Sequence, residues 1–484
     1  MERYKSNNSK SLWNFFEKIL SIPHPSHAED RLIAYIQQFA IEHNFEYKSD
    51  KVGNLLVIKP ANSGYENYPA IMLQGHCDMV CEKNKDNNFN FYNDKIDFEV
   101  VDNKMKANGT TLGADDGIGV ASMLAILDNK DLKTGKIGCL FTVCEEVGLY
   151  GAKNLDKSLL NNFDTLINLD SEEHGIFYIG CAGGLGTNAY FNYNSENIQE
   201  NYIYRKIAVK GLSGGHSGSD IHLNRGNAII ILNRLLWLFQ KKSEYKLCYI
   251  NGGNLRNAIP RECEAIIAIS PKVEKSFEKI FNYYKIDIEG RFSKTDPNIE
   301  VSFLPIEPIK TSIDDNTRRG IICSLRACPN GVISWCKDIK NVVETSTNIA
   351  SIKMLENNKI EIITTQRSCN KNEKQTIGER IETLFTMGGA EVIHNNEYPG
   401  WQPNIKSPIL NKAINIYKNM FNETPKVTTI HAGLECGLFY SYKKDLDIIS
   451  FGPTITGVHS PDETLYVDTV EKYWNLLINV ITEI

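Results

Sequence analysis

The stretch Gly138-Cys139-Leu140-Phe141-Thr142-Val143-Cys144-Glu145-Glu146 decides the fold, because a short apolar run ends there in two acids. An apolar run of this length, bounded by polar residues, is typical of a buried strand. The chain repeats the pattern twice. Residues 69–74 run into His76, and residues 165–169 run into Asp170. The sequence therefore predicts several buried strands, each followed by a side chain that can bind a metal or a proton.

A helix is predicted between the strands at 69–74 and 138–144. Its apolar side chains recur at helical spacing, and Asp115 stands at its start within Leu112-Gly113-Ala114-Asp115-Asp116-Gly117. Another apolar run, 54–58, precedes these elements, and strands that alternate with helices indicate an α/β sheet. Because ligands bind outside the carboxyl ends of strands in such sheets, we expect these polar residues to lie together.

An earlier helix is predicted over the apolar positions between Leu32 and Phe39. Ser26 and Glu29 have the spacing of a capping box, in which each side chain bonds to the backbone at the start of the helix.

The length of 484 residues is too great for one core, so we expect at least two domains. Residues 1–186 and 399–484 are predicted to form one discontinuous α/β domain with a mixed sheet. Residues 187–398 are predicted to form an inserted α+β lid domain. A weak internal similarity within the insert indicates two related halves.

The composition is that of an ordinary globular protein, with 42% hydrophobic and 23% charged residues. A net charge of −6 gives no basic surface for nucleic acid, and no apolar run is long enough to cross a membrane. The N-terminus lacks an apolar signal core, which favours a cytoplasmic protein.

The twelve cysteines include no Cys-x-x-Cys pair and several lie in apolar runs, so we expect reduced, mostly buried thiols.

Five side chains form the predicted metal site. Two imidazoles and three carboxylates suit two divalent ions that share one carboxylate, each ion keeping a position open for water. Zinc fits this set, and manganese or cobalt can substitute. The five are His76, Asp115, Glu146, Asp170 and His459.

Three neighbouring acids receive other roles. Neighbours on an extended backbone point to opposite sides, so Glu146 is predicted to bind metal while Glu145 transfers protons. Asp78 is predicted to orient His76 directly or indirectly. Asp115 is assigned as the bridging ligand and Asp116 as a local structural acid.

Glycine-rich segments supply the candidate substrate-binding residues. His216, in Gly214-Gly215-His216-Ser217-Gly218, is a candidate donor to a developing oxyanion. Asn257 and Arg261 are candidates for the polar ends of a substrate. Glu435, in Gly433-Leu434-Glu435-Cys436-Gly437, is a candidate partner for a substrate amino group.

The motifs, in this order, resemble the M20 family of dinuclear metallopeptidases, and most closely its Xaa-His dipeptidase branch. The stretches that point to the branch are 112–119, 212–218 and 431–437. The resemblance implies one ion on His76, Asp115 and Asp170, and another on Asp115, Glu146 and His459. It also implies Asp78 as a support for His76, Glu145 as general base and acid, and His216 as the lid histidine.

The resemblance leaves the assembly open. In members with small lids the histidine comes from a partner subunit, which makes a homodimer one expectation. In a double-length lid the second half can replace that partner.

The resemblance implies hydrolysis of dipeptides with a free N-terminus, including Xaa-His dipeptides. One alternative is an N-acyl amino acid deacylase, which shares the metal site but needs no acceptor for a free amine. Glu435 favours the dipeptidase for that reason. A further alternative is a non-catalytic binding protein, which would be expected to have lost ligands or Glu145, and none is lost.

Overall fold

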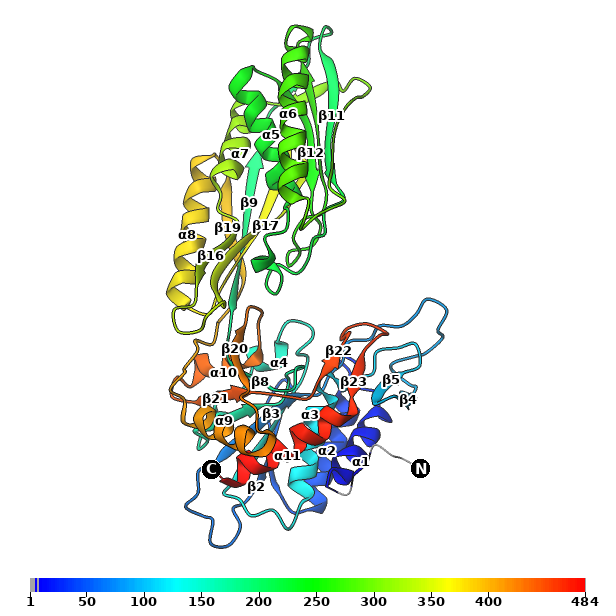
Figure 1. Ribbon diagram of the computed structural model, residues 1–484, viewed down its shortest axis with the longest axis vertical. Coiled ribbons are helices and arrows are strands. Elements are labelled where there is room, and N and C mark those ends of the chain that lie inside the picture. Colours follow the sequence, from blue (N-terminus) through cyan, green and yellow to red (C-terminus); the bar gives the residue numbers. More distant parts are fainter. Residues whose placement is uncertain (1–4, 7, 484) are drawn as a thin grey trace. The chain divides into compact units, whose positions relative to one another are not determined.

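The computed structural model describes residues 5–6 and 8–483 and divides into two compact units (Figure 1). The first unit ends at Cys181 and resumes over residues 401–429 and 434–484. The second comprises residues 182–400 and 430–433. The first unit thus ends five residues before the predicted domain boundary at 186. Residues 430–433, which were predicted for the first domain, group with the second unit, where Ala182 N donates to Ile430 O at 3.0 Å.

A mixed sheet of eight strands forms the centre of the first unit. Pairs β3–β6, β3–β7 and β7–β21 are parallel, whereas β1–β2, β2–β6 and β8–β21 are antiparallel. The carboxyl ends of β3, β6 and β7 therefore meet at one edge. In sheet order the strands are β1 (Glu46–Ser49), β2 (Leu55–Lys59), β6 (Ile137–Thr142), β3 (Ile71–His76), β7 (Thr165–Asn168), β21 (Asp447–Ser450), β8 (Ile176–Cys181) and β20 (Lys426–Ile430).

Helix α3 is the most buried helix of this unit, and it packs on β3 and on α1. Its apolar composition on every side suits a helix covered by protein all round. The helices of the first unit are α1 (Lys10–Leu20), α2 (Asp30–Glu42), α3 (Ala114–Asp128), α4 (Tyr150–Lys153), α9 (Pro408–Phe421), α10 (Glu435–Tyr442) and α11 (Val467–Glu483), with a 3₁₀ turn at Lys157–Leu160.

A second, smaller sheet of this unit carries the loop that contains His459. Strands β22 (Ile455–Thr456) and β23 (Thr464–Tyr466) form its hairpin, and β23 pairs with β5 (Lys104–Ala107), which pairs with β4 (Phe98–Val101).

The predicted capping box before α2 was wrong. Glu29 stands at the N-cap, but its side chain makes no cap bond. Instead Glu29 Oε1 accepts from the backbone N–H of Cys144 at 2.8 Å, and Ser26 Oγ donates to Asp78 at 2.8 Å. The two residues thus bond to distant segments near the strand ends rather than to their own helix.

The second unit contains one eleven-stranded sheet, and two parts of that sheet share a topology. The order β14-β11-β13-β12 is followed by β17-β18-β9-β19. Each part has the chain order strand, helix, two strands, helix, strand, and each places its first strand between its third and its fourth. This shared order supports the proposal of two related halves.

The first part holds β11 (Ile203–Lys210), α5 (Ala228–Lys242), β12 (Lys246–Gly252), β13 (Cys263–Ile269), α6 (Glu274–Phe292) and β14 (Glu300–Pro305). The second holds β9 (Gly183–Asn192), α7 (Asp315–Ala327), β17 (Val343–Leu355), β18 (Lys359–Ser368), α8 (Lys371–Met387) and β19 (Glu391–Tyr398). Short strands β10 (Ser195–Asn197), β15 (Thr311–Ile313) and β16 (Gly331–Trp335), and 3₁₀ turns at Ile221–Leu223 and Pro271–Val273, complete the unit.

No disulfide joins the twelve cysteines, all of which lie in the described part of the chain, and nine of them are buried, which confirms the predicted thiols. Within residues 5–6 and 8–483, no helix combines the length and the apolar character that crossing a membrane requires.

Candidate metal centre

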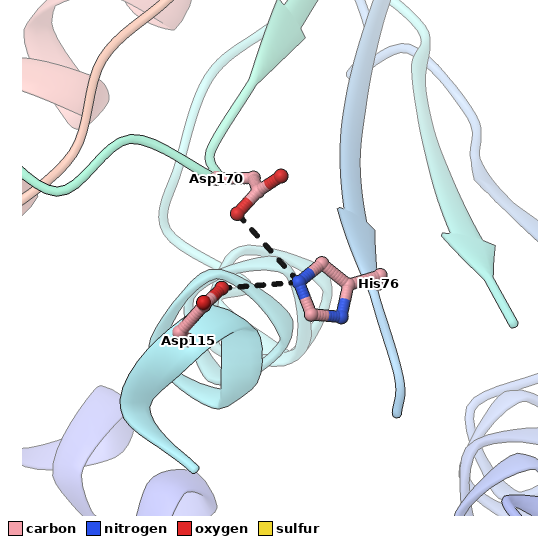
Figure 2. A group of neighbouring side chains, drawn as sticks. All are labelled: His76, Asp115 and Asp170. Carbon is pink, nitrogen blue, oxygen red and sulfur yellow. Dashed lines mark hydrogen bonds and ion pairs between the residues drawn. The ribbon is translucent and has the colours of Figure 1, made fainter. Parts of the chain in front are cut away.

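His76, Asp115 and Asp170 form one group of candidate ligands (Figure 2). His76 Nε2 lies 3.1 Å from Asp115 Oδ1 and 3.6 Å from Asp170 Oδ1. His76 ends β3, Asp115 lies at the start of α3, and Asp170 follows β7. The side chains of all three are at most about a tenth exposed.

A second group shares Asp115 with the first. His459 Nε2 lies 3.3 Å from Asp115 Oδ2 and 3.0 Å from Glu146 Oε1. The two oxygens of Asp115 therefore face two different histidines, which is the arrangement that a carboxylate bridging two ions requires.

A third group, His76 with Glu145 and Glu146, also has ligand atoms within 4.8 Å of one another. Glu145 thus lies near the same centre as Glu146, and geometry alone leaves both glutamates within reach of a cation. Their distinct roles stay a prediction that metal analysis of each variant can test.

Parallel strands bring these residues together, as the sequence predicted. Because β3, β6 and β7 run side by side in one direction, the residues that follow them emerge at one edge of the sheet. His459 reaches the site from the hairpin loop of the smaller sheet.

The carboxylate of Asp78 accepts hydrogen bonds from the backbone of both glutamates. Its Oδ1 accepts from Glu145 N at 2.8 Å, and its Oδ2 accepts from Glu146 N at 3.2 Å. His76 Nδ1 bonds to the Asp78 backbone oxygen at 3.0 Å, whereas the nearest carboxylate oxygen is 3.5 Å away. Burial raises the pKa of Asp78, but bonds from His76, Ser26 and Glu145 outweigh it and lower the pKa to about 2. The shorter contact of His76 Nδ1 is therefore with the main chain of Asp78, and the role of Asp78 in orienting His76 stays a prediction.

The charges of the site favour cations. Bonds to Asp115 and Glu146 raise the pKa of His459 to about 11. Burial lowers the pKa of His76, but Asp170 and Asp115 outweigh it and raise the pKa well above the usual value. Burial raises the pKa of Asp170 to about 7 and that of Glu145 well above its usual range. Divalent ions would replace the protons that this set of acids holds on the two imidazoles.

Asp116 is a structural acid, as predicted from its neighbours. It is 2% exposed, and its Oδ2 accepts from His76 N at 3.2 Å. A side chain at Gly75 or Gly119 would collide with this carboxylate, at 2.1 and 2.3 Å from the added carbon. The two glycines therefore make room for an acid that holds the strand end carrying His76.

Glu435 lies deeper than the sequence suggested. It is 0% exposed, and its Oε2 accepts from Gln74 at 2.5 Å and from Thr142 Oγ1 at 2.8 Å. Its Oε1 has no hydrogen-bond partner. Burial raises the pKa of Glu435 to about 8. One buried oxygen of Glu435 therefore remains available to a donor, and its pairing with a substrate amino group stays a prediction.

In the second unit, the loop around His216 fixes the tautomer of the imidazole. The backbone N–H groups of Gly218 and Ser219 approach His216 Nδ1 at 3.3 and 3.1 Å. Nδ1 therefore accepts, and the proton of the neutral ring resides on Nε2. Burial and the charge of Arg367 lower the pKa of His216, which favours this neutral ring. His216 can thus donate a hydrogen bond through Nε2.

Arg261 holds the same loop rather than standing free. Its Nε donates to Leu212 O at 2.9 Å, and its side chain fills the space beside Gly214. The Asn257 side chain is exposed, while its backbone oxygen accepts from Ser217 N at 2.7 Å. The predicted contact of Arg261 with substrate is therefore less well supported than a role in shaping the loop.

Sequence reasoning missed Arg367, the last residue but one of β18. It is 8% exposed, its Nη1 donates to Tyr398 Oη at 2.8 Å, and its Nε has no hydrogen-bond partner. Its charge lowers the pKa of both His216 and His431, after the larger effect of burial. His431 in turn bonds to Ser346 Oγ at 2.7 Å. The available signal was an arginine near the end of a strand in which several apolar residues recur.

Comparisons with known proteins show which family the chain resembles. The model of peptidase family M20/M25/M40 matches residues 72–483. The cytosol non-specific dipeptidase of Escherichia coli (strain K12) is 40% identical over 484 residues, covering 100% of this chain and 99% of that protein. The crystal structure of aminoacylhistidine dipeptidase from Vibrio alginolyticus superposes with a TM-score of 0.93 at 37% identity, covering 100% and 99% of the two chains. The aminopeptidase PepT of Bacillus cereus shares the fold, with a TM-score of 0.58 at 16% identity and 98% of both chains covered.

Proposed function

The chain belongs to peptidase family M20/M25/M40, and from this membership and the geometry of its ligands we propose that it is a metal-dependent dipeptidase. Its substrates are dipeptides with a free N-terminus, including Xaa-His dipeptides. The observation that carries the proposal is the position of Asp115 between His76 and His459, in a chain that matches a dipeptidase over its full length. The name of the Escherichia coli relative also supports a cytoplasmic location.

Two divalent ions fit the residues present, because two imidazoles and several carboxylates converge with their ligand atoms within 4.8 Å, and ions can replace the protons that the acids hold on the imidazoles. His76, Asp115 and Asp170 would hold one ion, and Asp115, Glu146 and His459 the other. Zinc suits the two imidazoles, with manganese or cobalt as substitutes. When bound, such ions lower the pKa of water and polarise a carbonyl group.

Glu145 is the proposed general base and acid. Its backbone is fixed by Asp78, and its carboxylate lies beside the group of candidate ligands, within reach of a proton on the attacking water and of the leaving nitrogen.

His216 is the proposed donor to the oxygen of the scissile carbonyl. Its Nδ1 is occupied by backbone donors, so Nε2–H is left for a developing negative charge. This proposal requires the second unit to act as a lid over the substrate. The histidine acts either within one chain, with the second half of the lid in place of a partner, or from the other subunit of a homodimer.

Substrate length would be set by charges at both ends. Glu435 Oε1 is the proposed acceptor for the amino group, which requires an opening towards this buried oxygen. Arg367, with Asn257 beside the His216 loop, is the proposed partner of the carboxylate. A bound ammonium group would lower the raised pKa of Glu435 and favour its charged form.

The alternative of an N-acyl amino acid deacylase is tested with four compounds. Metal-loaded protein is assayed on alanyl-histidine, its N-acetyl form, β-alanyl-histidine and a tripeptide. We expect cleavage of the free dipeptides, and N-acetylation should cost more than a change of side chain because it removes the charge that Glu435 accepts. Preferred cleavage of the N-acetyl form would establish the deacylase instead. Comparable cleavage of the tripeptide would refute the two-ended recognition.

A further inference from the structure

Glu463 accepts hydrogen bonds from four successive backbone N–H groups. Its Oε2 accepts from Leu112 at 2.7 Å and Gly113 at 3.0 Å, and its Oε1 accepts from Ala114 at 2.8 Å and Asp115 at 3.3 Å. Glu463 is 2% exposed. A buried carboxylate is costly unless its oxygens are satisfied, and here the satisfying donors all belong to one turn.

This turn is the start of α3, which has no side-chain cap of its own. The N-cap residue is Gly113, in the left-handed region at φ 73°, and glycine offers no side chain to the first N–H groups. Glu463 supplies the missing acceptor from a different part of the chain. The positive end of the helix also favours a negative charge at this position.

The backbone at Asp115 depends on this support more than an ordinary helical residue does. Asp115 has φ −86° and ψ 107°, and Asp116 is also outside the helical region. The regular bonds of the helix therefore do not fix the residue whose two oxygens face His76 and His459. The carboxylate of Glu463 is the group that holds its N–H.

Glu463 also joins the two ligand groups. It lies four positions after His459 in the loop between β22 and β23, and its own N–H donates to Ser460 O at 3.0 Å. The loop between β22 and β23 therefore carries the candidate ligand His459 and also, through Glu463, bonds to the turn that contains Asp115.

We propose that Glu463 is a positioning residue that sets the placement of Asp115 for both ions at once. The inference rests on the proposed function only in that it requires divalent ions to bind. It assigns Glu463 no contact with metal or substrate. Its distinctive consequence is that loss of the carboxylate weakens both metal sites together, whereas loss of a ligand to one ion weakens chiefly that site.

The test is Zn²⁺ titration of Glu463→Gln in competition with a chromogenic chelator, with folding checked by circular dichroism. Glutamine keeps one acceptor oxygen but turns an NH₂ group towards two N–H donors. We expect the affinity of both sites to fall by about 10–100-fold, the usual effect of removing a partner that orients a ligand. Glu99→Gln, an exposed glutamate on β4 of the same small sheet, is the control for the change of charge and should bind as the wild type does.

A purely structural cap would lower the melting temperature and leave the affinity of the folded protein unchanged, and that result would overturn the inference. Loss at one site alone would overturn it equally. If Glu463→Gln does not fold, the same titration of Glu463→Asp decides, because the retained charge still caps the helix while its oxygens are displaced. Wild-type protein that binds no Zn²⁺ would refute the proposed function itself, which separates the two failures.

Discussion

Replacement of Asp78 by asparagine should impair the site through the glutamates rather than through His76. The variant keeps the backbone oxygen that His76 Nδ1 contacts at 3.0 Å. It keeps only one of the carboxylate oxygens that accept from Glu145 N and Glu146 N, and its NH₂ group faces the other donor. The orientation of His76 should therefore survive while the turn carrying the two glutamates loosens.

The magnitude follows from the bonds that are lost. Asp78 is 1% exposed, so one backbone N–H is left buried without an acceptor. Such a group costs about 1–3 kcal/mol, and each ~1.4 kcal/mol corresponds to a tenfold change. We expect kcat/KM to fall by about 10–100-fold, in line with other residues that orient ligands.

The assay measures kcat/KM on alanyl-histidine and metal content on the same preparation. The ion at Glu146 and His459 should bind more weakly, and the ion at His76 and Asp170 should be retained. Ser26→Ala is the matched control, because it removes only the hydroxyl donor to Asp78 at 2.8 Å and leaves both acceptor oxygens in place. Full activity in Asp78→Asn, or selective loss of the ion at His76, would refute the reasoning.

Three further outcomes are expected. Glu145→Ala should keep its metal and lose about 10²–10⁴-fold in turnover, whereas Glu146→Ala should lose one ion; metal analysis with steady-state kinetics would expose a reversed pattern. His216→Ala should lower kcat with metal content intact, and mixing it with Glu145→Ala should restore activity only if the histidine comes from a partner subunit, provided that subunit exchange is demonstrated. Without metal, the folded-state pKa values of about 7 for Asp170 and about 11 for His459 both lie above the unfolded values. The stability that these two groups contribute is complete below the unfolded values and is lost as pH rises through the folded ones. Scanning calorimetry should therefore find a lower melting temperature at about pH 9 than at about pH 6, and bound Zn²⁺ should reduce the difference; the opposite slope would contradict these charges.

The strand ends could be predicted from the sequence because a buried strand appears as a short apolar run that stops at a polar residue. β3, β6 and β7 are short apolar runs, and each leads to a polar residue at the same edge of one sheet. Residues that follow neighbouring parallel strands lie at the same edge of the sheet. The proximity of His76, Asp170 and the two glutamates could therefore be predicted without any distances.

Contacts between distant segments could not be predicted in the same way. Ser26 and Glu29 have the spacing of a capping box, yet their partners are Asp78 and Cys144. In the sequence, Glu463 is one acid in a polar loop, and nothing near it indicates the four backbone N–H groups from which it accepts hydrogen bonds. Sequence spacing reports local bonds, and these bonds join residues that are far apart in the chain.

Helix α6 of the second unit is hard to predict from the sequence for a different reason. Its buried residues, Phe277, Phe281, Tyr284 and Ile288, follow a helical stripe. Tyr283 and Ile286 on the same helix are exposed at 69% and 72%, which blurs the contrast between its two faces. A stripe is readable only when the opposite face is polar.

Anomalous diffraction from crystals of the Zn²⁺-loaded protein would show whether Asp115 bridges two ions. A bridging carboxylate predicts two peaks about 3.5–4 Å apart. One should lie against His76 and Asp170, the other against Glu146 and His459, with one oxygen of Asp115 on each. A single peak, or two peaks that do not share Asp115, would contradict it.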